Sequence, residues 1–437
     1  MKTKHLWWLA AFIFALLFVG VVVLGLPWRW AIERRVDAIK ARGEPTCLVD
    51  LKPKPVPADQ DGGPQLEALW ATLSSEPAWK DRVFYGRGRD CVAAIRFCLG
   101  KGEAPDFFSK LDKSKQAEWK KRVSDLEDLL KRRPDLLVKV EEALNKPHCQ
   151  FKADYSQKTA SFLRSWLGSI RNSLNAMTDL SLYYEATNHD AEAQRCRLLF
   201  LRFPRTLDEG PGILIDALVR VAVNGIANTA LNGQFDLMND EELRQLQKAA
   251  DLAKPFPHSM SEMLKRERVF ALGYRELKID DLKASYGWFS PFGDRDQIWP
   301  QIQEKTFLYS GWRFYDYLQM INSYEDLIAG RPLGANKSYL WQLLGENMFP
   351  IRLKLLVESA KLRQLRLGIA LELIKRRDGR YPADLKSLDL PQEGADGKPM
   401  FYQVIDGGRG ACLEFFDKVT SKTMHFPLGD CDEKVHR

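Results

Sequence analysis

Histidine and cysteine are scarce in this sequence, with six and seven residues respectively among 437. The cysteines include no C-x-x-C pair, and no Cys/His cluster has the spacing of a zinc site. The sequence also has no G-x-S-x-G elbow, no G-x-x-x-x-G-K-[ST] phosphate loop, no H-E-x-x-H helix and no calcium-binding loop. These absences argue against the common serine-hydrolase, nucleotide-binding and zinc-protease classes. We therefore predict no catalytic, cofactor-binding or metal-ligating residue.

Long tracts of one charge are absent as well. The formal net charge is +7, and basic residues are interspersed with acidic ones. Nucleic-acid binding depends on clustered positive charge, so we expect no nucleic-acid partner. Hydrophobic residues make up 45% and charged residues 28% of the chain, a composition typical of a globular protein rather than a disordered one.

No charged residue occurs between Lys4 and Arg29. The apolar run of residues 6–26 is long enough, at about 1.5 Å per residue, to cross a hydrocarbon core of about 30 Å. It is longer than the apolar part of a cleavable signal peptide and ends in bulky residues, which favours a retained transmembrane helix over a signal peptide or a buried core helix. We expect four membrane-interface tryptophans at its two ends: Trp7, Trp8, Trp28 and Trp30.

The side of the membrane that carries the main domain is left open by the sequence. Basic residues after the run, such as Arg34 and Arg35, favour the cytoplasm, but long downstream domains cross the membrane largely regardless of charge. We favour an extracytoplasmic domain. In that compartment Cys412 and Cys431, both in the C-terminal region, could form a disulfide.

The remaining pattern predicts a mainly α-helical protein. We expect a membrane anchor at 1–30, followed over 31–64 by a short charged helix and a proline-rich spacer. A helical domain follows at 65–345, and 346–437 forms a long helix with a small antiparallel β module.

Residues 159–204 predict two antiparallel helices joined at Asn188, His189 and Asp190. The hairpin resembles a tetratricopeptide repeat, in which a small residue after the turn allows close helix crossing. No second copy occurs near a period of 34 residues, so a generic helical hairpin is the preferred interpretation.

Residues 212–233 predict a buried central helix, in which Asp216 and Arg220 are spaced to form an ion pair. A second membrane span is the alternative, although polar side chains make it expensive. Two later helices begin with candidate capping boxes, and the pairs are Asn239 with Glu242 and Ser259 with Glu262.

Aromatic residues are concentrated in 286–324. If this segment is helical, Tyr309, Trp312 and Tyr315 lie opposite its apolar stripe and form a candidate binding surface. Burial in the core is the favoured alternative, because aromatic stripes serve packing more often than recognition.

The C-terminal part begins with Pro350 and a long amphipathic helix that ends near Asp378 and Gly379. The string "ALELIKRRDGRYPADLKSL" (370–388), with "DGKPMFYQV" soon after, resembles the fold-back region of type II secretion pseudopilins, where a tyrosine-proline pair turns the chain. This resemblance covers about 45 residues and implies a local fold. The pseudopilin N-terminal anchor and cleavage site do not occur at this helix.

A broader resemblance covers most of the chain. The order of anchor, "RGEPTCLVDLKPKPVPADQDGGP" (42–64), "CQFKADY" (149–155), the helix at 212–233, residues 241–270 and "DGRYPADL" resembles an uncharacterised family of bacterial single-anchor helical proteins. The family resemblance implies an architecture and no chemistry.

We therefore predict a membrane-anchored helical interaction or scaffold protein of the bacterial envelope, held in the bilayer by residues 6–26, with one or more protein partners. An envelope enzyme acting on glycan through 286–324 is the first alternative. Asp294 and Asp296 could serve it as acid and base, but a solvated ion pair through Arg295 is favoured. An accessory of a secretion or pilus-like system is the second.

Overall fold

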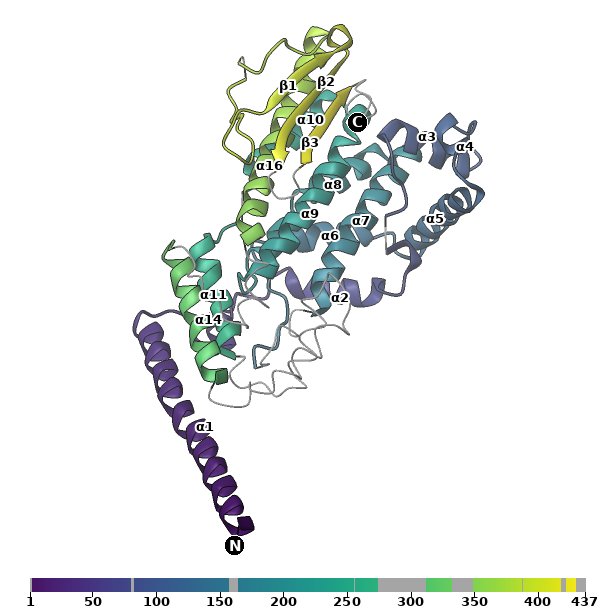
Figure 1. Cartoon of the computed structure of the whole chain (residues 1–437). Helices are drawn as coiled ribbons and strands as arrows, with labels where there is room; N and C mark the ends of the chain where they lie inside the picture. The colour runs from purple at the N-terminus through teal and green to yellow at the C-terminus, as the bar shows by residue number, and fades with distance from the viewer. Residues whose placement is uncertain are drawn as a thin grey trace.

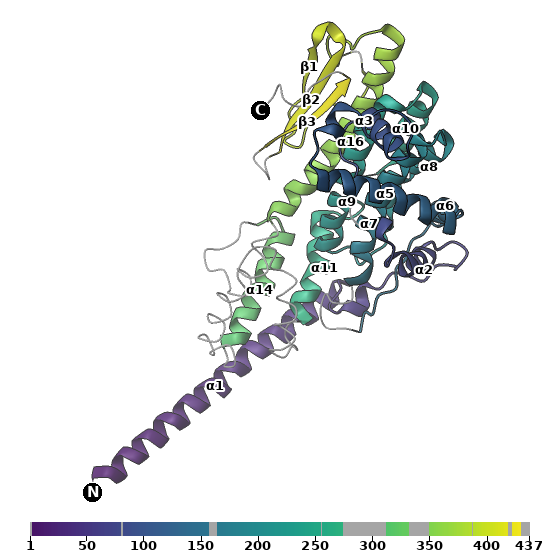
Figure 2. The same cartoon turned by 90° about the vertical axis from the view of Figure 1, so that its right-hand side faces the viewer.

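The computed structural model describes residues 2–79, 82–156, 164–254, 256–273, 312–331, 349–386, 388–417 and 422–429. Helices dominate this part of the chain, and a small antiparallel sheet lies at the C-terminal end (Figure 1). The predicted fold class, mainly helical with a C-terminal β module, is confirmed at this level. The first helix projects from one end of the molecule, and the sheet lies at the opposite end in both views (Figures 1 and 2).

Helix α1 is one continuous helix from Lys2 to Ala41. It contains the apolar run, passes through Pro27 and includes the segment expected to form a separate charged helix. Its outer half exposes Trp7, Trp8, Phe12 and Phe14. The apolar and charged segments therefore form a single rod (Figure 2).

The inner half of α1 packs against α14 (Trp312–Ile328). Ile32 and Ile39 are buried in a core cluster that also contains Met320 and Ile321. Arg35 Nη2 donates a hydrogen bond to Asn322 Oδ1 at 2.9 Å. The rod is thus fixed to the helical domain by apolar and polar contacts.

Helices surround an aromatic core in the first part of the domain. Phe84, Phe108 and Trp119 are buried there with ring centroids within 6 Å of a neighbouring ring. The elements are η1 (Leu48–Leu51), α2 (Gly63–Leu73), η2 (Pro77–Trp79), α3 (Gly88–Cys98), α4 (Asp106–Ser109), α5 (Lys113–Arg132) and α6 (Leu136–Asn145).

The proline-rich segment 52–64 has no regular structure over 52–57, turns at 58–60 and is tied to the loop after α6 before α2 begins. Gly62 N donates to His148 O at 2.9 Å, and His148 N donates to Gln60 O at 3.1 Å. Asp61 Oδ1 accepts from the backbone N–H of Gln150 at 2.8 Å. A Cβ atom at Gly62 would overlap the backbone of α6, so glycine permits this close approach.

The predicted helical hairpin is confirmed as α7 (Arg164–Ala186) and α8 (Asp190–Phe200). Asn188 adopts a left-handed φ of 61° in the turn, a conformation that asparagine tolerates. Ala193, a small residue in the first turn of α8, is fully buried.

Helix α9 (Leu214–Asn232) is long and apolar enough to cross a membrane, judged on the described side chains, which do not include those of residues 17–26 in α1. It packs between α7 and α16, as expected for a central core helix, and 44% of its most apolar window is buried. The elements from the hairpin onward are η4 (Phe203–Leu207), α9 (Leu214–Asn232), η5 (Phe235–Leu237), α10 (Asp240–Leu252) and α11 (Met260–Gly273).

The predicted ion pair between Asp216 and Arg220 is wrong. Asp216 Oδ2 accepts from the N–H of Ile213 at the start of α9. Arg220 instead pairs with Asp208 and with Glu358, whose Oε1 lies 3.1 Å from Arg220 Nε. The helix N-terminus offers unpaired N–H groups to Asp216, while carboxylates from other segments reach Arg220.

Both predicted capping boxes are confirmed. Asn239 Oδ1 accepts from Glu242 N at 3.0 Å, and Glu262 N donates to Ser259 Oγ at 3.2 Å. In each case the glutamate returns a bond to the backbone N–H of the capping residue. These reciprocal bonds fix where α10 and α11 begin.

Helix α16 (Phe349–Asp378) carries the C-terminal sheet. The sheet begins with β1 (Phe401–Ile405) and β2 (Gly410–Asp417), which are joined by η9 (Asp406–Gly408). A third strand, β3 (Lys422–Gly429), is not evident from the sequence pattern and pairs antiparallel with β2. The buried residues of α16 and the sheet share one core cluster with α7, α9 and α10.

The turn after α16 is held by Tyr381. Its hydroxyl donates to Glu372 Oε2 at 2.6 Å, and its backbone N–H donates to Gly408 O at 3.1 Å. One turn further back along the helix, the Phe426 ring of β3 lies directly over Gly368, where a Cβ atom would be 3.0 Å from Cζ and closer still to Cε1. The sheet therefore docks against a position of α16 that has no side chain.

Candidate functional site

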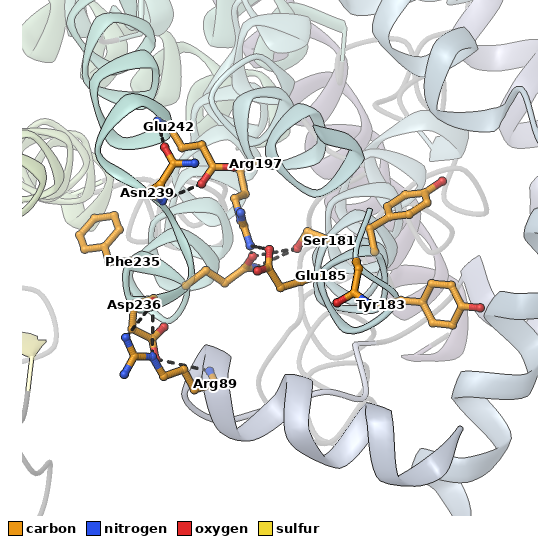
Figure 3. A network of polar contacts seen from close by, with 12 residues as sticks. Arg89, Ser181, Tyr183, Glu185, Arg197, Phe235, Asp236, Asn239 and Glu242 are labelled. Carbon is orange, nitrogen blue, oxygen red and sulfur yellow. Dashed lines mark hydrogen bonds and ion pairs between the residues drawn. The ribbon is translucent and has the colours of Figure 1, made fainter. Parts of the chain in front are cut away.

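A buried polar network lies where the α7–α8 hairpin meets η5 (Figure 3). Arg197 is fully buried, with Nη2 at 2.7 Å from Glu185 Oε2 and Nε at 2.9 Å from Gln234 Oε1. Gln234 Nε2 in turn donates to Ser181 Oγ at 2.9 Å. Burial raises the pKa of Glu185, while the Arg197 charge opposes the rise.

Arg89 extends the same region at the surface, where its backbone and guanidinium groups contact Asp236 (Figure 3). The central groups of this network bond to one another and join three elements. A buried charge with its partners in place favours one packing arrangement and offers little to a ligand. We assign the network a structural role.

A cleft of about 1070 Å³ lies at the inner end of α1. We call it the α1–α11 cleft, because the end of α1 and the first two turns of α11 form two of its walls. Loops close the other sides. The lining residues come from 40–46, 50–56, 148–150, 208–210 and 258–266.

Charged side chains dominate the lining. The basic members are Lys40, Arg42, Lys52, Lys54, Lys265 and Arg266. The acidic members are Glu44, Asp50, Asp208, Glu209 and Glu262. The two sets differ in whether their side chains already form ion pairs or hydrogen bonds within the protein.

Glu44 is the most heavily engaged carboxylate of the cleft. Its Oε2 lies 2.9 Å from Arg42 Nη2 and 2.8 Å from Arg268 Nη2, and its Oε1 lies 3.1 Å from Lys265 Nζ. Burial would raise the pKa of Glu44, but the hydrogen bonds from these three cations lower it to about 2. Glu44 is therefore a charged anchor point between α1 and α11.

Asp50 and Glu262 cap local turns. Asp50 Oδ2 accepts from Thr46 N at 2.8 Å and Cys47 N at 3.0 Å, and these bonds lower its pKa against the effect of burial. The pKa of Glu262 is lowered by hydrogen bonds from Ser259. Both carboxylates are satisfied by the backbone.

Asp208 and Glu209 are also paired. Asp208 bonds to the buried guanidinium of Arg220. Glu209 Oε1 lies 2.6 Å from His148 Nδ1. All five carboxylates of the cleft thus have protein partners.

Lys40, Lys52 and Lys54 differ from the carboxylates. All three side chains are exposed, and none forms a salt bridge within the described residues. Arg266 uses Nη1 to donate to Pro211 O at 2.9 Å and likewise has no carboxylate pair there. The available charge of the cleft is therefore positive.

The two histidines that line the cleft, His148 and His258, form no recognisable catalytic arrangement with the other described residues. His258 has its pKa lowered by burial and by the Arg266 charge, so it is a neutral ring near pH 7. His148 is oriented by Glu209, yet no hydroxyl or thiol bonded to its ring is found among the described residues. Burial raises the pKa of the neighbouring Cys149 thiol, which keeps it protonated.

Two carboxylates bond to the start of α9: Asp216, which is buried, and Glu267 of α11, which is half-buried. Burial raises the pKa of Asp216 to about 7, against hydrogen bonds from the backbone of Ile213 and Gly212 that lower it. Burial likewise raises the pKa of Glu267 to about 7, although Leu214 N donates to its carboxylate at 3.1 Å. Both carboxylates accept hydrogen bonds from backbone N–H groups at the N-terminal end of α9.

No group of three or more potential metal ligands occurs within the described residues. Of the predicted binding surface, Tyr309 lies outside the described residues and Trp312 begins α14 without a described side chain. The Tyr315 ring packs edge-on against Trp28, with centroids 4.8 Å apart. Tyr315 therefore contributes to the contact between α1 and α14.

The predicted interface tryptophans lie along α1. Trp7 and Trp8 are 78% and 77% exposed, and Trp30 is 58% exposed with the Arg34 guanidinium 3.4 Å from its ring centroid. For the predicted disulfide, Cys412 is buried in β2 and Cys431 lies outside the described residues.

The chain matches no known family model, curated protein or solved structure. The candidate site accordingly rests on its own residues. Sequence reasoning misses this cleft because its walls come from five distant segments. The alternating lysines and prolines of "KPKPVP" are the one local signal, and their pattern by itself indicates a spacer.

Proposed function

We propose that this protein is a single-anchor membrane protein whose helical domain binds a partner at the envelope. The observation that carries the proposal is the continuity of α1, which runs without a break from the apolar segment to Ala41. Its outer half exposes large apolar side chains, which water disfavours and a bilayer accommodates. Its inner half is fixed to α14, so the anchor and the domain move as one unit.

The Glu44 cluster supports the same proposal. Arg268 is fully buried between Glu44 and Glu325, and Arg42 bonds to both carboxylates. This cluster joins the residues just after α1 to α11 and α14. A protein that only needed to be tethered could have a flexible linker at this point. A fixed junction instead holds a binding surface of the domain at a constant distance from the membrane.

Extraction of membranes with alkaline carbonate tests the anchor. We expect the full chain to stay in the membrane fraction and to be released by detergent. The variant Phe14→Arg with Leu16→Arg places two charges in the apolar run, each costing roughly 2.5–3.5 kcal/mol at a helix centre, and should be released. Val49→Arg, at a position 59% exposed outside the run, serves as the control and should behave as the parent chain. Release of the parent chain by carbonate would overturn the proposal.

Cys47 provides a test of the side of the membrane. Its side chain is exposed just beyond the end of α1. If the domain is extracytoplasmic, a membrane-impermeant maleimide should label it in intact spheroplasts, and Cys47→Ser should remove that label. Labelling that requires lysis would place the domain in the cytoplasm.

A further inference from the structure

We infer that the α1–α11 cleft binds an acidic, extended peptide segment of a protein partner. The inference rests on the proposed binding role and names the chemistry of the partner. Each carboxylate of the cleft has a protein partner: a cation, backbone N–H groups or, for Glu209, the His148 ring. In contrast, Lys40, Lys52 and Lys54 have no salt bridge within the described residues. The cleft therefore offers positive charge to a ligand, while its negative charges are already engaged.

The spacing of two of these lysines favours an extended ligand. Lys52 and Lys54 alternate with prolines in a segment that has no helix or strand, and both line the cleft. Alternate residues of an extended or polyproline II chain are about 6–7 Å apart. Carboxylates at alternate positions of an extended peptide have the same spacing, so the two chains can lie side by side with charges matched.

The wall that carries these lysines is already ordered. Lys54 O accepts a hydrogen bond from Gln150 Nε2 at 2.8 Å, and the following residues are held by Asp61 and Gly62. Proline also fixes its own backbone angle. Binding therefore requires little ordering of the protein, which lowers the entropic cost of association.

The size of the cleft also favours a chain segment over a single small anion. Its volume of about 1070 Å³ is at the upper end of the range for small-molecule pockets. Leu51, Pro53 and Val56 also line the cleft, next to these lysines in the sequence. A peptide can use both features, because its backbone and aliphatic groups lie between its charged side chains.

Fluorescence anisotropy with the full chain in detergent micelles tests the inference. The probe is a labelled peptide of alternating glutamate and serine, and the matched peptide has glutamine in place of glutamate. We expect binding of the glutamate peptide only, with affinity that falls as salt is added. Lys52→Gln with Lys54→Gln should weaken it roughly tenfold. Lys101→Gln with Lys113→Gln, which removes two exposed lysines outside the cleft, should leave it unchanged.

Several results would overturn the inference. These are no binding of the glutamate peptide, equal binding of the glutamine peptide, or unchanged affinity in the Lys52/Lys54 variant. Inorganic polyphosphate that binds through Lys52 and Lys54 while the peptide does not would assign the cleft to phosphate chemistry instead. A chain that resists carbonate extraction but binds no peptide would leave the anchor proposal intact and remove only this inference.

Discussion

Arg268 Nη2 and Glu44 Oε2 lie 2.8 Å apart although 224 residues separate them in the chain. The guanidinium is fully buried, and Glu44 is only 13% exposed. The pair connects a residue just after α1 to the middle of α11. A buried cation of this kind requires its carboxylates, because water cannot replace them.

Glu44→Gln should therefore destabilise the protein by roughly 3 kcal/mol, since it leaves the buried Arg268 with Glu325 as its remaining acidic partner. Urea unfolding of the full chain in detergent, followed by circular dichroism, measures this loss. Glu127→Gln is the control, because Glu127 forms an exposed helical pair with Lys131 and should cost less than about 0.5 kcal/mol. Equal losses in the two variants would contradict the importance of the buried cluster.

The raised pKa values of Asp216 and Glu267 predict that the stability of the protein depends on pH. Both Asp216 and Glu267 have a pKa raised to about 7 by burial, whereas the unfolded chain releases these protons near pH 4. The folded state therefore holds more protons between these values. Stability should be greatest below about pH 4 for these two groups and should fall as the pH rises through 7, by up to about 1.4 kcal/mol per pH unit for each group.

Asp216→Asn tests this dependence, because asparagine keeps an oxygen for the N–H of Ile213 but does not titrate. The loss of stability between pH 5 and pH 8 should be smaller in this variant, as measured by urea unfolding across that range. Asp112→Asn removes an exposed capping carboxylate of α5 and is the matched control. An unchanged pH slope in Asp216→Asn would show that Asp216 does not titrate as proposed.

Two glycines inside helices predict opposite effects of the same substitution. Gly368→Ala should destabilise by about 1–3 kcal/mol, because its Cβ atom would displace the Phe426 ring and the sheet behind it. A Cβ atom at Gly225 of α9 would have Lys361 Nζ as its nearest neighbour at 3.8 Å, so Gly225→Ala should stabilise by roughly 0.5–1 kcal/mol. Thermal unfolding distinguishes them. If Phe426→Leu failed to relieve the Gly368→Ala defect, the steric explanation would be rejected.

Tyr381→Phe should cost about 1–2 kcal/mol, since it removes a 2.6 Å hydrogen bond to the buried Glu372. Tyr402→Phe is a suitable comparison, because its hydroxyl donates to Pro382 O in a half-buried position and should cost less. Urea unfolding at neutral pH provides the measurement. A larger loss in Tyr402→Phe would argue against Glu372 as the key partner in this turn.

Local patterns are enough to predict many of the helices. The α7–α8 hairpin and both capping boxes each depend on residues a few positions apart, and these predictions are confirmed. Strand β3 is not predicted, because "KTMHFPLG" contains a proline and shows no clear alternation of apolar and polar residues. Its strand conformation depends on antiparallel pairing with β2.

Long-range contacts are not predictable in the same way. Asp216 and Arg220 have helical ion-pair spacing, but the partners of Arg220 come from positions 208 and 358. The α1–α11 cleft similarly brings together five segments, and its uncompensated lysines become evident only when every nearby carboxylate has been assigned a partner. Periodicity describes one element at a time and carries no information on such pairings.

The docking of α1 has a consequence for the order in which the chain acquires its structure. The partners of its inner half are made late, since Asn322 follows Arg35 by 287 residues and Glu325 follows Arg42 by 283. Synthesis proceeds from the N-terminus, so α1 emerges first and has neither α11 nor α14 to pack against until most of the chain exists. Helix α1 is thus made before the helices that it packs against. During that interval Ile32, Ile39 and Glu44 are without their partners in α11 and α14.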